Sequence, residues 1–340
     1  MKVLIVKLSS IGDVVHTLPA LESLSRGFKN KGVKAEIDWL VEEAASSVLK
    51  NHPLINELIV VKRGWGKNLR ANLKAARGLK AREYDLVLDF QGLLKSGAWV
   101  FLSKGKKKVG FSNARELSHL AYNQKLPAFD IDQHAVDRYL ELAASAGGER
   151  GEAIFRIDAG KAAESIKKKL KAKGVVGPFF VMATRGRWAT KLWKDEKFIE
   201  LARRVTEEKK LRAVLAGGPS DREGLAGVAA AIGKSAVNMA GETDLKELFA
   251  LFRLGKFAVT VDSGPMHIAA ASGTKVVALF GPTAPWRTGP YGPDHIIIRK
   301  GLPCSPCFKK VCASPRCMEE ITVEDVLEAV DKLAKNCSFS

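Results

Sequence analysis

The sequence lacks any apolar run long enough to cross a membrane. A membrane-spanning helix needs about 20 consecutive, predominantly apolar residues, so a helical integral membrane protein is not expected. The apolar run near residues 2–8 is also too short and too β-branched for a secretion signal. We therefore expect a first strand there and a cytoplasmic protein. Its 46% hydrophobic and 27% charged residues suit a soluble globular fold.

Acidic residues are scarce relative to basic ones: 37 Asp and Glu stand against 55 Lys and Arg, which gives a formal net charge of +18. Adaptation to heat enriches Lys and Glu together, so it does not explain this excess. The charge predicts a polyanionic partner, which can be a nucleic acid, an anionic membrane surface or a phosphorylated ligand. The basic stretches carry no RNA-binding fingerprint, and nucleic acid is not the expected partner.

Cysteine is rare, with five residues, but four of them cluster as Cys304, Cys307, Cys312 and Cys317. This spacing could place four thiolates around a structural zinc or iron ion. The gaps are shorter than in the usual zinc ribbons, and reduced thiols or disulfides remain alternatives. We expect no catalytic metal.

The 340 residues suit two domains of ordinary size. Strand-like and helix-like segments alternate throughout, which predicts two doubly wound α/β domains with parallel sheets. Strands are expected near 2–8, 36–42, 57–61, 84–90, 107–111, 178–183, 212–217, 257–261 and 275–280, with helices that include 67–82, 134–146, 161–173, 195–209 and 265–272. We expect domains at 1–165 and 166–321, followed by a segment at 322–340 whose helix packs back on the first domain.

Such folds bind ligands at the carboxyl ends of their strands, and residues 257–273 are the most informative example. An apolar strand ends in Asp262-Ser263-Gly264, and Pro265 opens a helix of small residues. Free backbone N–H groups and the helix dipole suit a phosphate or diphosphate at this point. An ordinary strand-to-helix junction capped by Asp or Ser is the alternative.

Two further loops carry side chains that suit chemistry. Ser10 and Asp13 follow the first strand, and the carboxylate can take a proton from an acceptor hydroxyl or simply cap the next helix. After the first strand of the second domain, Lys191 with Thr184 or Thr190 can hold a diphosphate. Asp221 can cap its own helix or bond a sugar hydroxyl.

Basic residues gather in loops of the first half, which suggests that a second substrate is also an anion. The residues concerned are Lys62, Arg63, Lys67, Arg115 and Arg138. The lysine run at 104–108 is instead expected to form a solvated turn.

Together these motifs resemble those of the bacterial lipopolysaccharide heptosyltransferases, and heptosyltransferase I in particular. In the first half the resemblance rests on VLIVKLSSIGDVVHTLPAL near the start, VKRGWGK at 61–67, YDLVLDFQGLLKS at 84–96, NARE at 113–116 and HAVDR at 134–138. In the second half it rests on TRGRWATKLW at 184–193, GETDL at 241–245, VDSGPMHIAAASG at 261–273 and ALFGPT at 278–283. The motifs come in the expected order.

The resemblance implies a GT-B glycosyltransferase, with two Rossmann-like domains and a cleft between them. It implies inverting, metal-independent transfer of L-glycero-D-manno-heptose from ADP-heptose to a 3-deoxy-octulosonic acid (Kdo) residue of lipid A, at the inner face of the inner membrane. Asp13 would be the general base, with Ser10 beside it, and Lys191 would stabilise the leaving diphosphate. The implied donor contacts are Ser10, Thr184, Lys191, Asp221, Thr243, Asp262, Ser263, Gly264 and His267; the implied acceptor contacts are Lys62, Arg63, Lys67, Arg115 and Arg138.

Alternatives remain within and outside this family. The cysteine cluster resembles heptosyltransferase II and other heptosyltransferases more than heptosyltransferase I, so heptosyltransferase II or a protein heptosyltransferase is one alternative. A non-catalytic protein that binds anionic glycolipid or RNA is the other.

Overall fold

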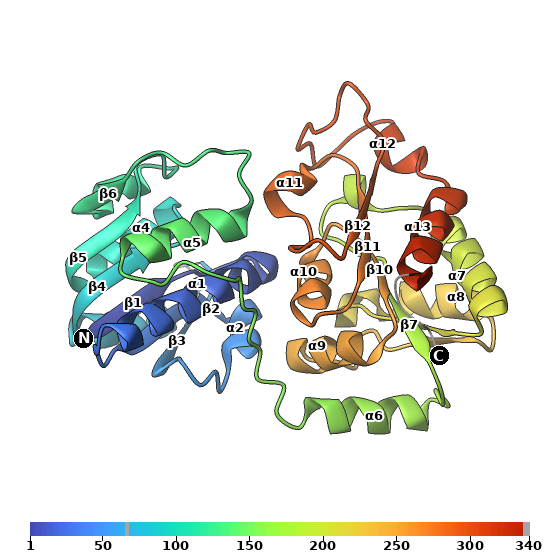
Figure 1. The fold of residues 1–340 in the computed structure, drawn as a ribbon, viewed down its shortest axis with the longest axis horizontal. Helices are drawn as coiled ribbons and strands as arrows, with labels where there is room; N and C mark the ends of the chain where they lie inside the picture. The colour runs from blue at the N-terminus through green and yellow to red at the C-terminus, as the bar shows by residue number, and fades with distance from the viewer. Residues whose placement is uncertain (65–67, 336–340) are drawn as a thin grey trace. The chain divides into compact units, whose positions relative to one another are not determined.

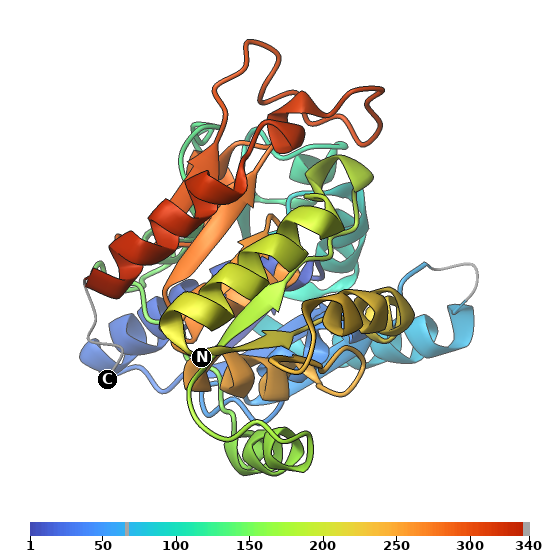
Figure 2. The ribbon, with the colours of Figure 1, turned by 90° about the vertical axis from the view of Figure 1, so that its right-hand side faces the viewer.

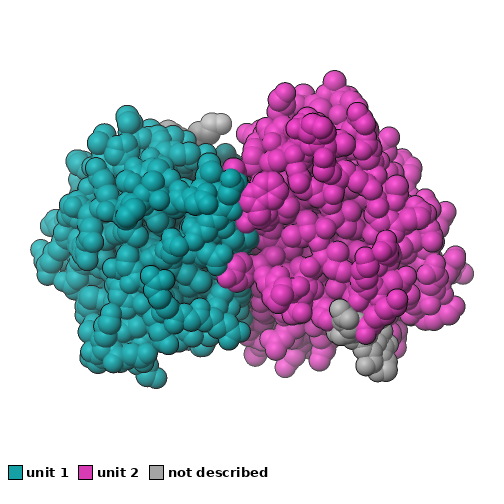
Figure 3. All heavy atoms as spheres, turned by 45° about the horizontal axis from the view of Figure 1, so that its top comes forward, with its two compact units in different colours: residues 1–158 teal, residues 159–340 magenta. Residues whose placement is uncertain are grey.

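The computed structural model describes residues 1–64 and 68–335. The chain forms two compact units, residues 1–158 and 159–340, which are coloured separately in Figure 3. Lys67, expected to contact the acceptor, lies outside the described residues.

Unit 1 contains a six-stranded parallel sheet with the strand order β3-β2-β1-β4-β5-β6 (Figure 1). Its strands are β1 (Lys2–Val6), β2 (Glu36–Glu42), β3 (Glu57–Val61), β4 (Glu83–Asp89), β5 (Lys104–Phe111) and β6 (Gln124–Leu126). Its helices are α1 (Ile11–Asn30), α2 (Glu43–Leu49), α3 (Leu69–Lys80), α4 (Leu94–Leu102), the 3₁₀ turn η1 (Ser118–Ala121) and α5 (Ala135–Ser145).

Two helical layers cover this sheet. Leu4 and Val6 of β1 belong to a core that includes Leu79 of α3 and Trp99 of α4, so α3 and α4 cover one face. Helices α1 and α5 pack against each other, as do α1 and α2. Because parallel strands are buried on both faces, β1 is apolar at consecutive positions rather than at alternating ones.

Unit 2 repeats this plan with the strand order β12-β11-β10-β7-β8-β9. Its strands are β7 (Phe179–Ala183), β8 (Arg212–Leu215), β9 (Ala236–Asn238), β10 (Ala258–Val261), β11 (Val276–Phe280) and β12 (Ile296–Arg299). Its helices are α6 (Ala162–Ala172), η2 (Ala189–Lys191), α7 (Asp195–Lys209), η3 (Pro219–Asp221), α8 (Arg222–Ile232), α9 (Leu245–Leu254), α10 (Gly264–Ala271), α11 (Pro285–Thr288), α12 (Arg316–Glu319) and α13 (Val323–Lys335).

Helix α13 lies beside α7 and β12 within unit 2 (Figure 2). The expected packing of this last helix on the first domain stays a prediction. Val326, Val330 and Leu333 join the core of unit 2, so the apolar face of α13 is buried there. The expected boundary at 165/166 differs from the observed start of unit 2 at residue 159.

The lysine run at 104–108 is not a turn but the first half of β5, and this expectation was wrong. The backbone of Lys104, Lys107 and Lys108 pairs with β4, while Lys104, Lys106 and Lys107 keep exposed side chains. Pairing of the backbone therefore outweighs the low strand propensity of lysine. The short strands β6, β9 and β12 were not predicted, because three or four residues carry little periodicity.

In both sheets the order in which strands are added changes direction once, after the third strand. In unit 1 the chain winds outward from β1 to β3, crosses back, and places β4 on the other side of β1; in unit 2, β10 is placed beside β7 in the same way. The carboxyl ends of β1 and β4, and those of β7 and β10, therefore leave a crevice where open α/β sheets bind ligands.

Candidate active site

Asp13 lies at the β1/β4 crevice, in the first turn of α1. Ser10 is the N-cap of that helix, and its backbone N–H and hydroxyl donate to Asp13 Oδ2 at 2.8 and 2.7 Å. These bonds fix the carboxylate and satisfy an amide that the helix end leaves unpaired. The structure thus shows the capping function considered for Asp13, exerted from the third helical position.

A polar network holds the loop that precedes Asp13. The side-chain oxygen of Gln91 accepts the N–H groups of Leu8 and Ser9 at 3.2 and 3.0 Å. Lys95 Nζ donates to Ser9 Oγ at 2.5 Å and to Glu42 Oε1 at 2.8 Å. The loop is therefore tied to β2 and β4, and sequence reasoning gave no function to Glu42 or Gln91.

The turn that carries Gln91 is organised by Asp89, whose side chain is buried. Its carboxylate accepts the N–H groups of Gln91 and Gly92 and the hydroxyls of Ser96 and Tyr122, at 2.7 to 3.1 Å. Burial raises the pKa of the Asp89 carboxyl, and these four hydrogen bonds act against that shift. Asp89 is a structural support for the crevice.

Lys7 is a second buried charged residue beside this crevice, with 1% of its surface exposed. Its ammonium donates to the carbonyl of Phe90 at 2.8 Å and to the hydroxyl of Tyr139 at 2.6 Å. It also lies 4.4 Å from the centre of the Tyr139 ring, a cation–π distance. Lys7 therefore connects β1, β4 and α5, a function that the apolar pattern around it did not indicate.

The structure distributes the expected acceptor residues along the carboxyl edge of the sheet. Lys62 and Arg63 follow β3, and Arg115 follows β5, with exposed side chains in each case. Four strand spacings separate β3 from β5, about 19 Å at about 4.8 Å each. In residues 1–64 and 68–335, none of these three cations is in an ion pair, so all can meet an anion.

Arg138 is placed differently, on α5. Its guanidinium lies 4.5 Å from the centre of the Phe129 ring, which fixes part of its orientation. His134, the N-cap of α5, stacks edge-on against His16 of α1 at 5.2 Å between ring centres. The backbone of Phe129 is hydrogen-bonded in both directions to the side chain of Asn113, in the loop that follows β5. Arg138 thus lies on the α1–α5 layer and next to the loop after β5.

In unit 2, Lys191 and Asp262 meet at the β7/β10 crevice. Lys191 Nζ lies 2.6 Å from Asp262 Oδ2, and the same oxygen accepts the Thr283 hydroxyl at 2.6 Å. Lys191 Nζ also lies 4.5 Å from the centre of the Trp188 ring. Both charged side chains are largely buried, so the pair is fixed in one geometry. An ammonium has three N–H donors, and Asp262 occupies one of them.

Two hydroxyls at the same crevice have no hydrogen-bond partner among the residues that the structure describes. They are Thr184 Oγ1, after β7, and Ser263 Oγ, at the N-cap of α10. A buried polar atom without a partner costs free energy, so these hydroxyls favour a polar ligand here. Helix α10 begins at Gly264 with Pro265 next, one residue earlier than expected, and its N-terminal amides face the same end of the sheet.

Asp221 makes the capping contact that was the alternative to a sugar contact. Its Oδ2 accepts the backbone N–H of Gly218 at 2.8 Å, which closes the turn after β8. Arg185, in the loop after β7, forms a two-pronged ion pair with Asp195 at 2.5 and 2.8 Å. This pair fixes the loop that carries Lys191 to the start of α7.

The remaining expected donor residues are Thr243, just before α9, and His267, in α10; these two helices pack together. Thr243 is half-buried and precedes Asp244, the N-cap of α9. His267 is buried in the first turns of α10. Both belong to the layer beside the crevice.

The four clustered cysteines were expected to hold a structural metal. Among the described residues, no group of three or more Cys, His, Asp or Glu side chains is arranged to hold a metal ion. Cys304 and Cys312 are exposed, Cys307 is half-buried and Cys317 is buried, and all four are free thiols. Burial raises the pKa of the Cys317 thiol, and the other three thiols raise it further. The expected structural metal is not supported.

The cysteine segment instead forms part of the wall of the unit 2 crevice. The N–H groups of Cys307 and Phe308 donate to the carbonyl of Pro282, next to Thr283. Thr190 Oγ1 donates to the carbonyl of Lys309 at 2.8 Å, so Thr190 is already engaged. Lys310 Nζ lies 5.5 Å from the centre of the Trp188 ring, the ring that Lys191 also approaches. Sequence reasoning missed this function of the segment.

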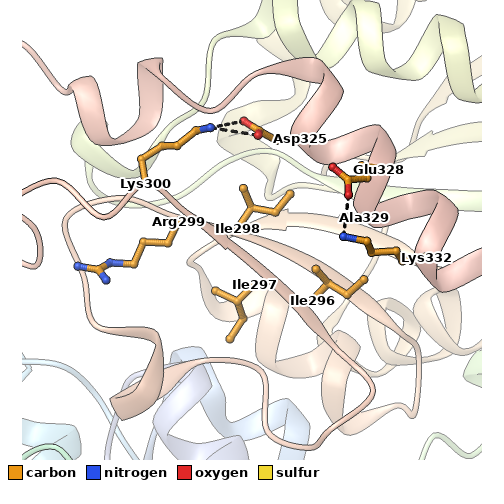
Figure 4. Close-up of a pocket in the computed structure, with 9 residues that line it drawn as sticks. All are labelled: Ile296, Ile297, Ile298, Arg299, Lys300, Asp325, Glu328, Ala329 and Lys332. Carbon is orange, nitrogen blue, oxygen red and sulfur yellow. Dashed lines mark hydrogen bonds and ion pairs between the residues drawn. The ribbon is translucent and has the colours of Figure 1, made fainter.

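A pocket of about 250 Å³ lies elsewhere in unit 2, between β12 and α13 (Figure 4). Four of its five charged lining residues pair with one another, Lys300 with Asp325 and Lys332 with Glu328; the fifth is Arg299. None of the expected site residues lines it. The two strand crevices therefore remain the candidate site.

Comparison with known proteins decides the family. Residues 72–317 match the model of glycosyltransferase family 9 (heptosyltransferase), and this range is more than half of the chain. The chain belongs to glycosyltransferase family 9. It is a glycosyltransferase, and its two Rossmann-like units are those of the GT-B fold.

Several family 9 relatives are similar over both units. Lipopolysaccharide heptosyltransferase 1 of Pseudomonas aeruginosa is 34% identical over 326 residues, which cover 92% of this chain and 87% of that protein. The structure of Escherichia coli heptosyltransferase WaaC with ADP-2-deoxy-2-fluoro heptose has a TM-score of 0.78 and 28% identity, and the match covers 98% of this chain and 99% of WaaC. Lipopolysaccharide heptosyltransferase 2 of Salmonella typhimurium is 26% identical, with 88% of each chain covered.

No helix among the described residues of this family 9 member has the length and apolar character to span a bilayer.

Proposed function

We propose that this glycosyltransferase moves L-glycero-D-manno-heptose from ADP-heptose to a Kdo residue of the lipopolysaccharide inner core, with inversion at the anomeric carbon. The observation that carries the proposal is the similarity to heptosyltransferase 1, which extends over both units. The identity to heptosyltransferase 2 is lower over a similar length. This difference supports Kdo over a heptosylated core as the acceptor.

The unit 2 crevice supports binding of the donor diphosphate. Lys191 offers a positive charge, and α10 offers backbone N–H groups. Thr184 and Ser263 offer hydroxyls that have no hydrogen-bond partner in residues 1–64 and 68–335. Gly264 at the start of α10 permits close approach of a phosphate to the backbone. Thr243 and His267 would contact the nucleotide sugar from the α9 and α10 side of the crevice. Asp221 would contact it only if its carboxylate accepted a sugar hydroxyl in addition to the Gly218 N–H.

The unit 1 crevice supports activation of the acceptor. Asp13 would take the proton of the acceptor hydroxyl as that oxygen forms a bond to the anomeric carbon of heptose. The bond from that carbon to the diphosphate breaks on the opposite face, and ADP leaves with the electron pair. Lys191 and the amides of α10 would stabilise the charge on ADP as it develops. In this proposal the charge on the leaving ADP is stabilised without a metal ion.

An acceptor panel tests this function. Purified protein with radiolabelled ADP-heptose should label Kdo-lipid A, and should label neither heptosylated core nor protein. Preferential labelling of heptosylated core would support heptosyltransferase II instead, and labelling of protein would support a protein heptosyltransferase. Binding of the glycolipid without turnover of ADP-heptose would show a non-catalytic protein and would contradict the proposal.

The exposed cations predict a variant that separates acceptor from donor. Changing Arg63 and Arg115 to Ser should raise the KM for Kdo-lipid A about tenfold or more, because each removes an unpaired positive charge. The affinity for ADP should stay within about twofold, since both residues lie in unit 1. Initial rates over a range of acceptor concentrations and calorimetric titration with ADP measure the two effects. Equal weakening of both substrates would contradict the division of labour between units.

The same proposal places the enzyme at the inner face of the inner membrane, as a peripheral protein. Its acceptor is a glycolipid with its acyl chains in a bilayer, so the reaction occurs at a lipid surface. The excess of positive charge on the chain favours an anionic surface.

A further inference from the structure

The helical layer over one face of the unit 1 sheet exposes an unusual number of large apolar side chains. Helix α3, helix α4 and the η1 turn form this layer, which we name the α3–α4–η1 face. The exposed fractions run from 39 to 75% for Leu69, Leu73, Leu94, Phe101, Leu117 and Leu120. Soluble proteins rarely expose apolar patches of this kind without a partner.

These side chains belong to one continuous surface. Leu94 and Phe101 are seven residues apart on α4 and share a helix face. The η1 turn lies directly on α4, because a Cβ on Gly97 would come within 3.0 Å of the Ser118 Cα. The Leu94 N–H also donates to Glu116 at 3.1 Å. Leu117 and Leu120 are therefore neighbours of the α4 stripe, and α3 packs against α4 on its other side.

The charge around this apolar surface is positive. Helix α3 exposes four cations and contains no acidic residue: Arg70, Lys74, Arg77 and Lys80. None of the four is in an ion pair in the described part of the chain. In β5, Lys107 is exposed, whereas Lys106 pairs with Asp85 at 2.8 Å and Lys104 lies opposite Glu83. Glu116 is the exposed acid on the η1 side.

We propose that the α3–α4–η1 face docks unit 1 onto a bilayer that carries anionic lipid. Apolar side chains that emerge between cations suit the boundary between headgroups and acyl chains. A protein partner of matching acidity would bury Phe101 and Leu120 to a similar extent. The four exposed cations along the length of α3, next to the apolar side chains of α4 and η1, favour an extended anionic surface.

The position of the face fits the proposed function. The docking itself does not depend on that function; only the reason for docking, access to a glycolipid acceptor, rests on it. Leu94 is the first residue of α4, and the side chain of the next residue, Lys95, reaches Ser9 and Glu42 in the crevice. The Arg115 N–H bonds to the carbonyl of Gly92 in the same turn at 2.9 Å. A glycolipid held by its acyl chains beside Leu94 would thus present its anionic sugars to the cations of the carboxyl edge.

Vesicle co-sedimentation of the full-length protein tests the inference without either substrate. The protein should bind vesicles of equal parts phosphatidylglycerol and phosphatidylcholine, and should bind pure phosphatidylcholine and high-salt samples weakly. Changing Phe101 and Leu120 to Ser should reduce the partition constant about tenfold for each side chain. Changing Lys74 and Arg77 to Glu should reduce it about fivefold or more for each charge.

Matched variants in unit 2 provide the control. Val176 and Val311 are exposed to 79 and 85%, so changing both to Ser removes apolar surface elsewhere. Lys167 and Lys168 on α6 are exposed, so changing both to Glu matches the loss of charge. An equal loss of vesicle binding in control and α3–α4–η1 variants would overturn the inference. So would a fall in sedimentation coefficient of the α3–α4–η1 variants alone, which would show a contact between copies of the chain.

A deacylated Kdo acceptor keeps this result distinct from the transferase proposal. Variants of Phe101 and Leu120 should transfer heptose to it at the unaltered rate. If the unaltered protein binds vesicles but transfers no heptose, the docking face stands and the proposed function fails.

Discussion

Changing Asp13 to Asn should lower kcat for heptose transfer by about 10²–10⁴-fold, the usual contribution of a general base. Asparagine has the shape of aspartate but cannot take the acceptor proton. It keeps an oxygen that can accept the Ser10 N–H, so the N-terminus of α1 should remain capped. Single-turnover transfer from ADP-heptose measures the rate, and titration with ADP should show unchanged donor affinity.

The control for this prediction separates the cap from the base. Asp13→Ala removes both functions, and should lower the free energy of unfolding by about 1 kcal/mol in addition to the loss of transfer. Ser10→Ala removes the hydroxyl that donates to Asp13 but leaves the carboxylate in place. Its transfer rate should fall far less than that of Asp13→Asn. Near-normal transfer by Asp13→Asn would remove Asp13 from the proposed mechanism.

Changing Lys191 to Met should lower kcat by about 10²–10³-fold, because the charge that develops on the leaving diphosphate would lose its nearest cation. The same change leaves the buried Asp262 carboxylate without its ammonium, 2.6 Å away in the native protein. Breaking a largely buried pair in this way should lower the free energy of unfolding by about 3 kcal/mol. Urea denaturation and steady-state kinetics measure the two effects.

The double variant Lys191→Met with Asp262→Asn distinguishes chemistry from stability. The neutral amide can still accept the Thr283 hydroxyl, so most of the lost stability should return. Transfer should stay low, because the positive charge is still absent. Lys194→Met is the matched control: it removes an exposed lysine three residues away, 62% exposed, and should change neither quantity much. Recovery of transfer in the double variant would show that Lys191 has a structural function only.

The fold could be predicted because its signals are local. Runs such as Val3–Val6 and Val276–Phe280 are apolar at consecutive positions, which is typical of parallel strands buried on both faces. The alternation of such runs with helical periods predicted two doubly wound units, and the family match agrees. Short edge strands and the lysine-rich β5 escaped prediction, since backbone pairing with a neighbour and not residue type makes them strands.

The candidate site was predicted residue by residue but not as an assembly. Asp262 stands out in the sequence directly after an apolar run, and Asp13 and Lys191 stand out in the polar segments that follow such runs. The pairing of Lys191 with Asp262 follows from the position of β10 beside β7, which joins segments about 70 residues apart. Gln91 reaches Ser9 directly and Glu42 reaches it through Lys95, again by contacts between distant segments, and neither residue has a distinctive sequence context.

The sequence by itself determined the α/β class, the two-unit organisation and the chemical groups available at the strand ends, because these depend on periodicity and residue type. Only the tertiary structure decided which strand ends are neighbours, that the cysteine segment lies beside Thr283, and that α13 belongs to unit 2. Strand order and helix docking arise from contacts between distant segments, and their energy depends on the fit of whole surfaces. The periodicity and residue types of a single segment do not show how well two whole surfaces fit.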